Sequence, residues 1–270
     1  MDVNKKRIVI HSASWYDENQ EERLQTEMDI RAEKRNIRKR ILAIRDDLDS
    51  GEQKRASLLL TERILGHQWY YRADKLLCFV SYGSEISTTE IMKEAWKAGK
   101  KVYVPKVLSG FPEIQPGAGQ SFFDTQPDSE KKLPEHQKAI GERGRLYLRK
   151  EFAGKGGRTE CRAPHYMEFY RITSPGDLEP GYRGIPEPAG TTEIYVYSGE
   201  TAEQTLMLMP GVAFDRYRIR LGYGRGFYDR YLADKPGLWL RTIAVGYRCQ
   251  MVDKLPGEDT DIRPCQVICL

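Results

Sequence analysis

The feature that most limits the fold is a pair of short apolar runs separated by one helical segment. The first run, Lys75–Ser81 (KLLCFVS), is almost continuously apolar, as expected of a strand covered on both faces. A helix is predicted between Ser87, its N-cap, and Gly99, its stop signal, and Lys101–Val104 then forms a second strand that Pro105 ends. Strand, helix and strand in this order predict parallel pairing with a right-handed connection. We therefore expect an α/β protein with a mostly parallel sheet flanked by helices.

Two helices are predicted before this unit. Residues 1–20 show no sustained period and are expected to form an extension, and helical composition begins near Glu21. The second helix has Ser50 as its N-cap, Gln53 as its capping-box partner and Gly66 as its stop. The buried stripes predicted for the two helices are Ile37, Ile41, Ile44 and Leu48 in the first, and Ala56, Leu59, Leu60 and Ile64 in the second.

The rest of the chain predicts one domain with an insertion. Further strands are expected at Tyr166–Ile172 and Leu240–Tyr247. Between the two halves, residues 108–165 are rich in glycine, proline and charge, which is typical of a long inserted segment. The prediction is an extension at residues 1–30 followed by a single α/β domain at 31–270, interrupted by that insertion.

Composition limits the partners and the compartment. The 43 Lys and Arg residues exceed the 39 Asp and Glu residues by a net charge of only +4, so basic character is local and a generic nucleic-acid binder is disfavoured. Five cysteines, an odd number without a C-x-x-C pair, disfavour a disulfide framework and a zinc site. No run approaches the roughly 18 apolar residues of a membrane span. We expect a cytoplasmic protein that binds no membrane; the oligomeric state is left open.

One stretch has the make-up of a phosphate-binding site. Met209–Leu232 (MPGVAFDRYRIRLGYGRGFYDRYL) places Gly222, Gly224 and Gly226 at alternate positions among arginines. Glycine permits positive φ and close approach of backbone N–H groups to an anion, and arginine adds fixed positive charge. Phe227–Leu232 is predicted to begin a helix whose positive end faces the phosphate. The alternative is a mobile surface loop.

Other charged residues extend this hypothesis. Lys34 and Arg38 lie one turn apart on a helix, so they can reach one anion together. Asp229 and Asp261 offer the hard oxygen ligands that Mg²⁺ prefers, and Mg²⁺ bound to phosphates needs only one or two carboxylates. Glu85, just past a predicted strand end, is either a site residue or an ordinary loop carboxylate. The residues alone establish phosphate binding as the prediction, because neither G-x-x-x-x-G-K-[ST] nor G-x-G-x-x-G is present.

The central motif also carries a resemblance. RLGYGRGFYD (Arg220–Asp229), with MPGVAFD before it, resembles the signature of the 5-formyltetrahydrofolate cyclo-ligase family. Further similar segments follow in the same order: KRNIR (34–38), SEISTTEI (84–91), GKKVYVPKV (99–107), YMEFYRI (166–172), GIPEP (184–188) and P-x-x-x-x-D (256–261). The resemblance implies an ATP- and Mg²⁺-dependent cyclisation of 5-formyltetrahydrofolate to 5,10-methenyltetrahydrofolate, with release of ADP and phosphate. The formyl oxygen attacks the γ-phosphate in that mechanism, and N10 closes the ring as phosphate leaves.

Roles for single residues follow from the resemblance. It implies that the ATP site comprises Lys34, Arg38, Arg220, Leu221, Gly222, Tyr223, Gly224, Arg225, Gly226, Phe227 and Tyr228, with Arg220 and Tyr228 also catalytic. It implies that Asp229 and Asp261 hold Mg²⁺, and that the folate contacts Arg38, Val80, Glu85, Met167 and Tyr182. The implied partners are therefore two small molecules, a reduced folate and ATP.

The sequence departs from the family pattern at three places. Phe227 stands where the family commonly has the first of two tyrosines, and the tail after Asp261 lacks later acidic and threonine positions. The third departure is the insertion after Val107, which falls between the folate-side segments. Two alternatives therefore stay open. One is a non-catalytic relative that binds folate or nucleotide, and the other is an ATP-dependent enzyme of the same fold that acts on another formylated or amide substrate.

Overall fold

The computed structural model describes residues 4–110, 165–190 and 192–270 of the 270-residue chain. The helices are α1 (Asn4–Asp46), α2 (Ser50–Leu65), α3 (Gln68–Arg72), α4 (Thr89–Lys97), α6 (Gly199–Glu203), α7 (Phe227–Leu232) and α8 (Pro236–Trp239). The strands are β1 (Lys75–Leu77), β2 (Lys101–Ser109), β3 (His165–Ile172), β4 (Leu178–Pro180), β5 (Pro186–Pro188), β6 (Thr205–Met209), β7 (Ala213–Asp215), β8 (Arg220–Leu221), β9 (Thr242–Gly246), β10 (Met251–Val252) and β11 (Gln266–Cys269). Short 3₁₀ turns occur at Pro175–Asp177, Tyr182–Gly184 and Arg248–Gln250.

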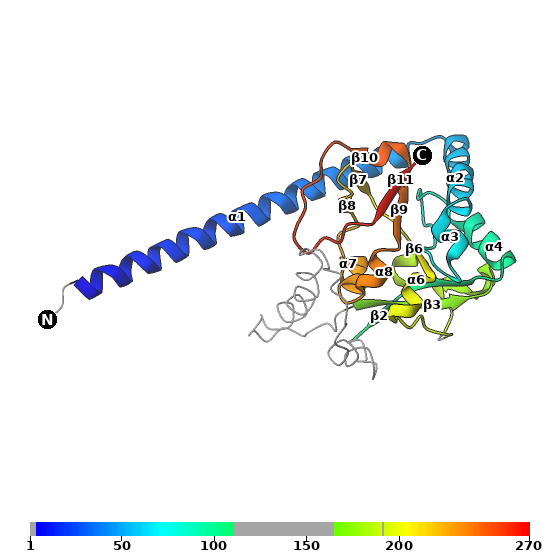
Figure 1. Ribbon diagram of the computed structural model, residues 1–270. Coiled ribbons are helices and arrows are strands. Elements are labelled where there is room, and N and C mark those ends of the chain that lie inside the picture. The colour runs from blue at the N-terminus through cyan, green and yellow to red at the C-terminus, as the bar shows by residue number, and fades with distance from the viewer. Residues whose placement is uncertain (1–3, 111–164, 191) are drawn as a thin grey trace.

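A six-stranded sheet in the order β11-β9-β6-β1-β2-β3 forms the centre of the protein. β1 pairs in parallel with β2 and β6, β9 pairs in parallel with β6 and β11, and β3 runs antiparallel to β2. Helix α4 connects β1 to β2, as the two apolar runs predict. The prediction of an α/β fold with a mostly parallel sheet flanked by helices is confirmed (Figure 1).

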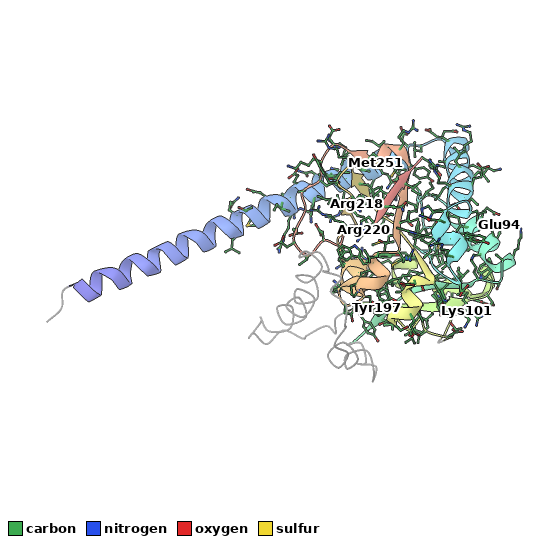
Figure 2. The ribbon with its side chains drawn as sticks, in the orientation of Figure 1. Glu94, Lys101, Tyr197, Arg218, Arg220 and Met251 are labelled. Carbon is green, nitrogen blue, oxygen red and sulfur yellow. The ribbon has the colours of Figure 1, made fainter. Side chains whose placement is uncertain are left out.

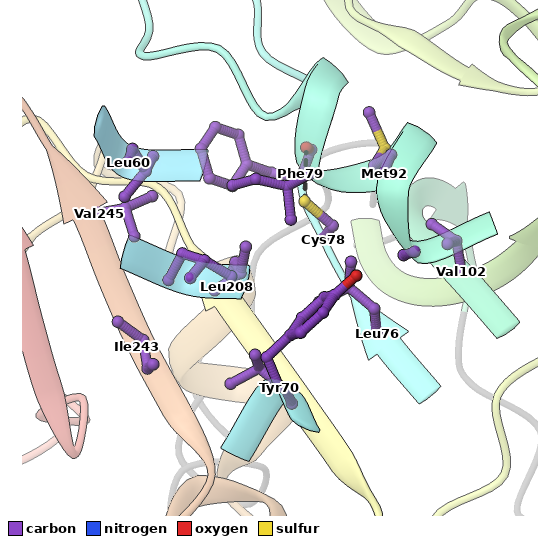
Figure 3. Close-up of a cluster of buried hydrophobic side chains, with 14 of the residues drawn as sticks. Leu60, Tyr70, Leu76, Cys78, Phe79, Met92, Val102, Leu208, Ile243 and Val245 are labelled. Carbon is purple, nitrogen blue, oxygen red and sulfur yellow. Dashed lines mark hydrogen bonds between the residues drawn. The ribbon is translucent and has the colours of Figure 1, made fainter. Parts of the chain in front are cut away.

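Alternate residues of the central strands pack on opposite faces of the sheet. Leu76 and Leu208 belong to the cluster beneath α2, α3 and α4, whereas Leu77 and Met207 belong to the cluster that packs with α7 and α8. Figure 3 shows the first cluster, in which Leu60 of α2 packs over the strands. Because side chains alternate along a strand, burial on both faces requires a nearly continuous apolar run. Each fully buried leucine contributes about 1.5–3 kcal/mol.

Helix α1 is 43 residues long and begins well before the expected position near Glu21. Its sequence contains no proline or glycine, so nothing interrupts the helix from Asn4 to Asp46. Residues 4–20, which we expected to form an extension without a period, therefore continue the same helix, and Figure 1 shows this end of α1 pointing away from the body. The C-terminal part packs through Ile41 against Val212 and Leu221, beside the small sheet β10-β7-β8.

Several boundary predictions are wrong by one residue or one turn. The N-cap of α2 is Asp49, whose carboxylate accepts from the backbone N–H groups of Gly51 and Glu52, and not Ser50. Gln53 instead donates its side-chain amide to the carbonyl of Leu48. An Asp placed one residue earlier competes well for the same backbone donors, since Asp and Ser are similar N-cap residues.

The start of α4 shows the same kind of shift. Its N-cap is Thr88 and not Ser87, although the Ser87 hydroxyl does accept from the Thr89 N–H at 3.3 Å. At the other end Gly99 has φ +73°, and its N–H bonds back to the carbonyl of Trp96, which confirms the predicted stop signal.

Strand β2 continues through Pro105 to Ser109, which also differs from the prediction. The parallel ladder with β1 ends at Tyr103, so from Pro105 onward β2 pairs on one side only, with β3. A proline is tolerated where its missing N–H faces no partner strand.

Two predicted core residues, Ile44 and Leu59, are exposed.

The inserted segment lies mostly outside the described residues, which stop at 110 and resume at 165. The four cysteines in the described part, Cys78, Cys249, Cys265 and Cys269, are free thiols, as predicted. Of the helices that the structure describes, none has a stretch long and apolar enough to span a membrane.

Candidate active site

The candidate site lies where the chain reverses its direction of winding across the sheet. β1 and β6 are neighbours in the sheet; after β1 the chain crosses to β2, whereas after β6 it crosses to β9 on the other side. Ligands of open α/β sheets bind outside the carboxyl ends of the strands at such a point. A crevice is present there, lined by Arg45, Phe79, Glu85, Ile86, Pro210, Gly211, Val245 and Gln250.

The glycine-rich loop follows β8 and meets this crevice through Tyr223, whose hydroxyl contacts Arg45 and Glu85 of the lining. Gly224 has φ +94° and Gly226 φ +62°, so both positions use the left-handed freedom of glycine. Gly222 does not have a positive φ, but a Cβ atom there would lie 2.9 Å from Nη1 of Arg220. The predicted helix after the loop is present as α7, which is only six residues long. Backbone N–H groups and side chains, more than a helix dipole, therefore determine how this loop meets an anion.

Arg38 of α1 lies against the glycine loop. Its Nε donates to the carbonyl of Gly222 at 2.8 Å, and a Cβ atom at Gly224 would lie 3.4 Å from the guanidinium carbon. Burial lowers the pKa of Arg38, and the nearby carboxylates of Asp261 and Glu258 oppose this effect. The structure thus brings the predicted basic residue of α1 and the glycine loop together, although they are 184 positions apart in sequence.

Arg220 is paired with Asp229. Its Nη2 lies 3.0 and 3.2 Å from the two carboxylate oxygens, and the guanidinium stacks over the ring of Tyr228 at 5.5 Å. The Nε atom is buried without a hydrogen-bond partner among the described residues. Figure 2 labels Arg220 next to Arg218, in the region where α1 joins the body. A residue predicted to bind ATP is therefore ion-paired with one predicted to bind Mg²⁺.

Lys34 makes the second pair of this kind. Its buried ammonium lies 2.7 Å from Asp261 and 2.7 Å from Glu258. The two pairs are adjacent, because the backbone N–H of Ile262 donates to Asp229 at 3.1 Å. Asp229 and the turn that carries Asp261 thus lie side by side at the edge of the glycine loop.

The donor set fits a magnesium ion bound together with phosphates. Within the described ranges, no group of three or more His, Cys, Asp or Glu side chains is arranged to hold a metal ion alone. Mg²⁺ needs no such cage when water and phosphate oxygens complete its octahedron, and Asp229 and Asp261 supply suitable hard oxygens. In the structure both oxygens of Asp229 accept from Arg220 and Oδ2 of Asp261 accepts from Lys34, so a metal would share these carboxylates with the two cations or replace them.

Glu85 lines the crevice and faces Tyr223 of the glycine loop. One carboxylate oxygen accepts from the backbone N–H of Tyr82 at 3.0 Å, and the other accepts from the hydroxyl of Tyr223 at 2.5 Å. Burial raises the pKa of Glu85, and the hydrogen bond from Tyr223 opposes this rise. Each oxygen thus has one protein donor and retains a second lone pair that can accept an N–H group from a ligand.

The predicted apolar folate residues are only partly brought together. Val80 packs with the core cluster on one face of the sheet, whereas Met167 packs with the cluster on the other face. Tyr182 lies beside Phe227, with ring centroids 6.0 Å apart in an edge-on arrangement. Phe227 is therefore in contact with one predicted folate residue, although it lacks the family's hydroxyl.

Two residues of the predicted ATP motif, Leu221 and Tyr228, pack their side chains against the hydrophobic clusters of the protein. Leu221 packs into the cluster with Ile41, so its side chain does not face the loop surface. Tyr228 packs against Phe169, its hydroxyl has no partner among the described residues, and burial raises its pKa well above the usual value. Arg225 is exposed on the loop.

Sequence reasoning missed two residues of this site, Arg45 and Glu258. Arg45 is buried in the last turn of α1, donates from Nε to Ser84 and from Nη1 to Tyr223, and lines the crevice. A signal was available, because Arg45 is seven residues after Arg38 and so lies on the same helix face. Glu258, which shares Lys34 with Asp261, is not singled out by the sequence motifs.

The comparisons with known proteins agree with this architecture. The profile of the 5-formyltetrahydrofolate cyclo-ligase family matches residues 30–269. A probable 5-formyltetrahydrofolate cyclo-ligase of Caenorhabditis elegans is 25% identical, covering 89% of this chain and 92% of the relative. The 5-formyltetrahydrofolate cyclo-ligase of Haemophilus influenzae is 24% identical, covering 85% and 93%.

Solved structures support the fold. The NMR structure of Aquifex aeolicus 5,10-methenyltetrahydrofolate synthetase superposes with a TM-score of 0.55 at 23% identity, covering 86% of each chain. A synthetase of the same description from Mycoplasma pneumoniae superposes with a TM-score of 0.51 at 16% identity, covering 87% of this chain and 97% of that one. Since the family profile spans nearly the whole described body, the chain belongs to the 5-formyltetrahydrofolate cyclo-ligase family.

Proposed function

We propose that this protein converts 5-formyltetrahydrofolate to 5,10-methenyltetrahydrofolate, with hydrolysis of ATP to ADP and phosphate and with Mg²⁺ as the metal. The observation that carries this proposal is the meeting of two chemically different half-sites at the glycine loop. Arg38, Arg220 and the loop form a cationic half, and Glu85, which the loop contacts through the hydroxyl of Tyr223, forms an acceptor half. Family membership supplies the identity of the two substrates.

The cationic half is suited to a triphosphate. Arg38 and Lys34 reach it from α1, and Arg220 reaches it from β8. Guanidinium groups bind phosphate through two parallel N–H donors, and the unpartnered Nε of Arg220 is one donor that is already free. We propose that these three cations and the backbone of the loop bind ATP.

The two carboxylates next to these cations are proposed to hold Mg²⁺. Asp229 and Asp261 would bind it together with water and phosphate oxygens, and the ion would neutralise charge that develops on the β- and γ-phosphates. Arg220 and Lys34, released from the carboxylates, would then turn to the phosphates. The same residues thus pair with each other without ligand and with the ligand when it is bound.

The acceptor half is suited to a pterin, whose ring edge presents N–H donors. Glu85 accepts such donors, and Tyr182 and Phe227 offer aromatic surface for the rest of the folate. The protein's contribution to the chemistry is then orientation: it places the formyl oxygen in line with the γ-phosphorus, and N10 next to the formyl carbon. Arg220 neutralises the phosphoryl group during transfer, and the unpartnered Tyr228 hydroxyl is a donor for a substrate oxygen.

The proposal is tested by incubating the purified protein with 5-formyltetrahydrofolate, ATP and Mg²⁺. Methenyltetrahydrofolate is followed by its absorbance and ADP by a coupled assay, with each substrate and the metal omitted in turn. We expect product and ADP in equal amounts, and only in the complete mixture. Absence of both product and ADP would refute the proposal.

The two alternatives give different outcomes in the same assay. A non-catalytic relative binds folate or nucleotide but releases no ADP. An enzyme that acts on another substrate releases ADP when a different formylated or amide compound replaces 5-formyltetrahydrofolate.

A further inference from the structure

Tyr223 connects the two halves of the candidate site. It stands between Gly222 and Gly224 in the glycine loop, yet its hydroxyl donates to Glu85 on the opposite side of the crevice. Burial and the neighbouring Glu85 raise the pKa of Tyr223. One hydrogen bond therefore joins the proposed nucleotide loop to the proposed pterin acceptor.

Arg45 holds the tyrosine in this place. Its Nη1 donates to the Tyr223 hydroxyl at 2.8 Å, and its guanidinium lies 5.8 Å from the centre of the Tyr223 ring. The side chain is buried, and no carboxylate among the described residues lies within ion-pair distance of it. Arg45 thus donates hydrogen bonds to Tyr223 and Ser84, and the bond to Tyr223 positions its hydroxyl next to Glu85.

Glu85 has no oxygen left without a protein donor in this arrangement. Tyr82 N–H occupies one oxygen and the Tyr223 hydroxyl occupies the other. Each oxygen can accept a second hydrogen bond, but the phenol of Tyr223 stands against Oε1, where the second N–H donor of a pterin would approach, and the backbone donor on Oε2 is fixed by the turn. A pterin that presents two N–H donors therefore needs the Tyr223 phenol to move aside. Folate binding therefore competes with the Tyr223 contact.

Nucleotide binding acts on the same contact from the other side. Arg38 holds the loop through the carbonyl of Gly222, and Arg220 packs under Gly222 while bound to Asp229. A triphosphate that engages these guanidiniums withdraws both anchors from the loop. Since Gly222 and Gly224 flank Tyr223, the loop can then move and carry the hydroxyl away from Glu85.

We propose that the Tyr223 hydroxyl is a latch that couples the two substrate sites, so that bound nucleotide tightens folate binding and bound folate tightens nucleotide binding equally. The proposal rests on the proposed function, and Tyr223 acts in it as a positioning residue. Both ligands favour the released state of the loop, and ligands that favour one state of a two-state element show positive coupling. We expect a coupling factor of about 10 in the unaltered protein.

The test measures four dissociation constants by calorimetry on the full chain. The ligands are 5-formyltetrahydrofolate and a non-hydrolysable ATP analogue with Mg²⁺, each titrated with the other absent and present. The variant is Tyr223→Phe, which removes the hydroxyl and keeps the ring. Tyr217→Phe is the matched control, because Tyr217 is 47% exposed against 48% for Tyr223 and its hydroxyl contacts Arg216 outside the crevice. Urea unfolding of each variant shows whether the fold is retained.

In the absence of nucleotide, Tyr223→Phe is expected to lower the dissociation constant for the folate by about 10-fold. The coupling factor, the ratio of the dissociation constants without and with the second ligand, is expected to fall to about 2 or less. A structural role alone does not predict tighter binding on loss of a hydroxyl. If the unaltered protein binds both ligands independently, or if Tyr223→Phe keeps the full coupling, the latch is overturned while the proposed function stands. If the unaltered protein binds neither ligand, the proposed function fails and the latch fails with it.

Discussion

Replacing Asp229 by Asn tests the ion pair at the centre of the site with almost no change in shape. The Arg220 side chain is 3% exposed and that of Asp229 is 22% exposed. Removing one partner of a fully buried pair costs about 3–5 kcal/mol, because the other charge is left unpaired. Here Arg220 keeps the Pro210 carbonyl and the Tyr228 ring, and Asp229 is partly solvated, so we expect a loss of about 2 kcal/mol in the free energy of unfolding.

The same change separates metal binding from nucleotide binding. Without Asp229, Arg220 no longer has to leave a carboxylate before it meets a phosphate, so nucleotide binding without Mg²⁺ is expected to tighten by a few fold. The gain in affinity that Mg²⁺ gives the unaltered protein is expected to shrink, because one proposed metal ligand is gone. Turnover is expected to fall by about 100-fold, the usual scale for losing one electrostatic contact to a transferring group.

Three measurements on Asp229→Asn check this reasoning. Urea unfolding gives the stability change, calorimetry with a non-hydrolysable nucleotide in Mg²⁺ or in EDTA gives the metal effect, and absorbance gives turnover. Asp234→Asn is the matched control, since Asp234 is 74% exposed and pairs only at the surface with Lys235, so its loss costs about 0.5 kcal/mol or less. Unchanged Mg²⁺ dependence in Asp229→Asn would refute the assignment of Asp229 as a metal ligand.

Three further outcomes are expected. Glu85→Gln, which keeps only one acceptor oxygen for a pair of N–H donors, raises KM for the folate by about 10-fold, as steady-state kinetics at saturating ATP will show. Gly211→Ala places a Cβ atom 2.6 Å from the ring of Phe214 and lowers stability by about 2 kcal/mol in urea unfolding, whereas Gly199→Ala, with nothing within 4 Å, has little effect. Hydrogen bonds from a tyrosine, then from a lysine and an arginine, lower the pKa of Glu193 from 4.5 to about 2. Because Glu193 is exposed, Glu193→Gln lowers the free energy of unfolding by only about 1 kcal/mol at neutral pH. The unaltered protein loses this advantage as its carboxylate is protonated, so the stability difference between the two proteins shrinks between pH 4.5 and pH 2. A stability difference that stayed constant over this range would contradict the reasoning.

The sheet was predictable because burial on both faces leaves a strong pattern. Strands such as β1 and β9 show nearly continuous apolar runs, and their positions were predicted to within a few residues. Caps and strand ends were less predictable, because neighbouring residues such as Asp49 and Ser50 offer the backbone nearly the same hydrogen bond. The end of β2 could not be predicted locally, because it depends on whether another strand pairs with Pro105, which is decided by the tertiary structure.

The buried face of α1 shows a different limit of prediction from sequence. Hydrophobic periodicity selected the stripe that contains Ile44, but the buried face of the helix runs through Lys34, Ile41 and Arg45. When the buried face of a helix is chosen by hydrophobicity, charged residues are assumed to face solvent. On a helix with buried cations, the predicted face is therefore rotated away from the face that is buried. Lys34 and Arg45 can be buried on this face because each has partners within the protein, carboxylates for Lys34 and hydroxyl groups for Arg45.

The charges of the ion-paired cluster beside the glycine loop favour a divalent metal there. Within this cluster opposite charges are equal in number: Lys34, Arg38 and Arg220 against Asp229, Glu258 and Asp261, while Arg225 lies exposed on the loop outside the cluster. A free triphosphate is strongly negative and would meet a cluster with no net positive charge, so its attraction to the cations would be offset by repulsion from the carboxylates. Asp229 and Asp261 would hold a divalent cation, which would supply positive charge next to the phosphates, and Lys34 and Arg220 would then be available to the phosphate oxygens. The cluster is therefore expected to discriminate strongly between ATP alone and ATP with Mg²⁺, and the motif by itself did not reveal this, because a motif names the charged residues but not the partners they have before the ligand arrives.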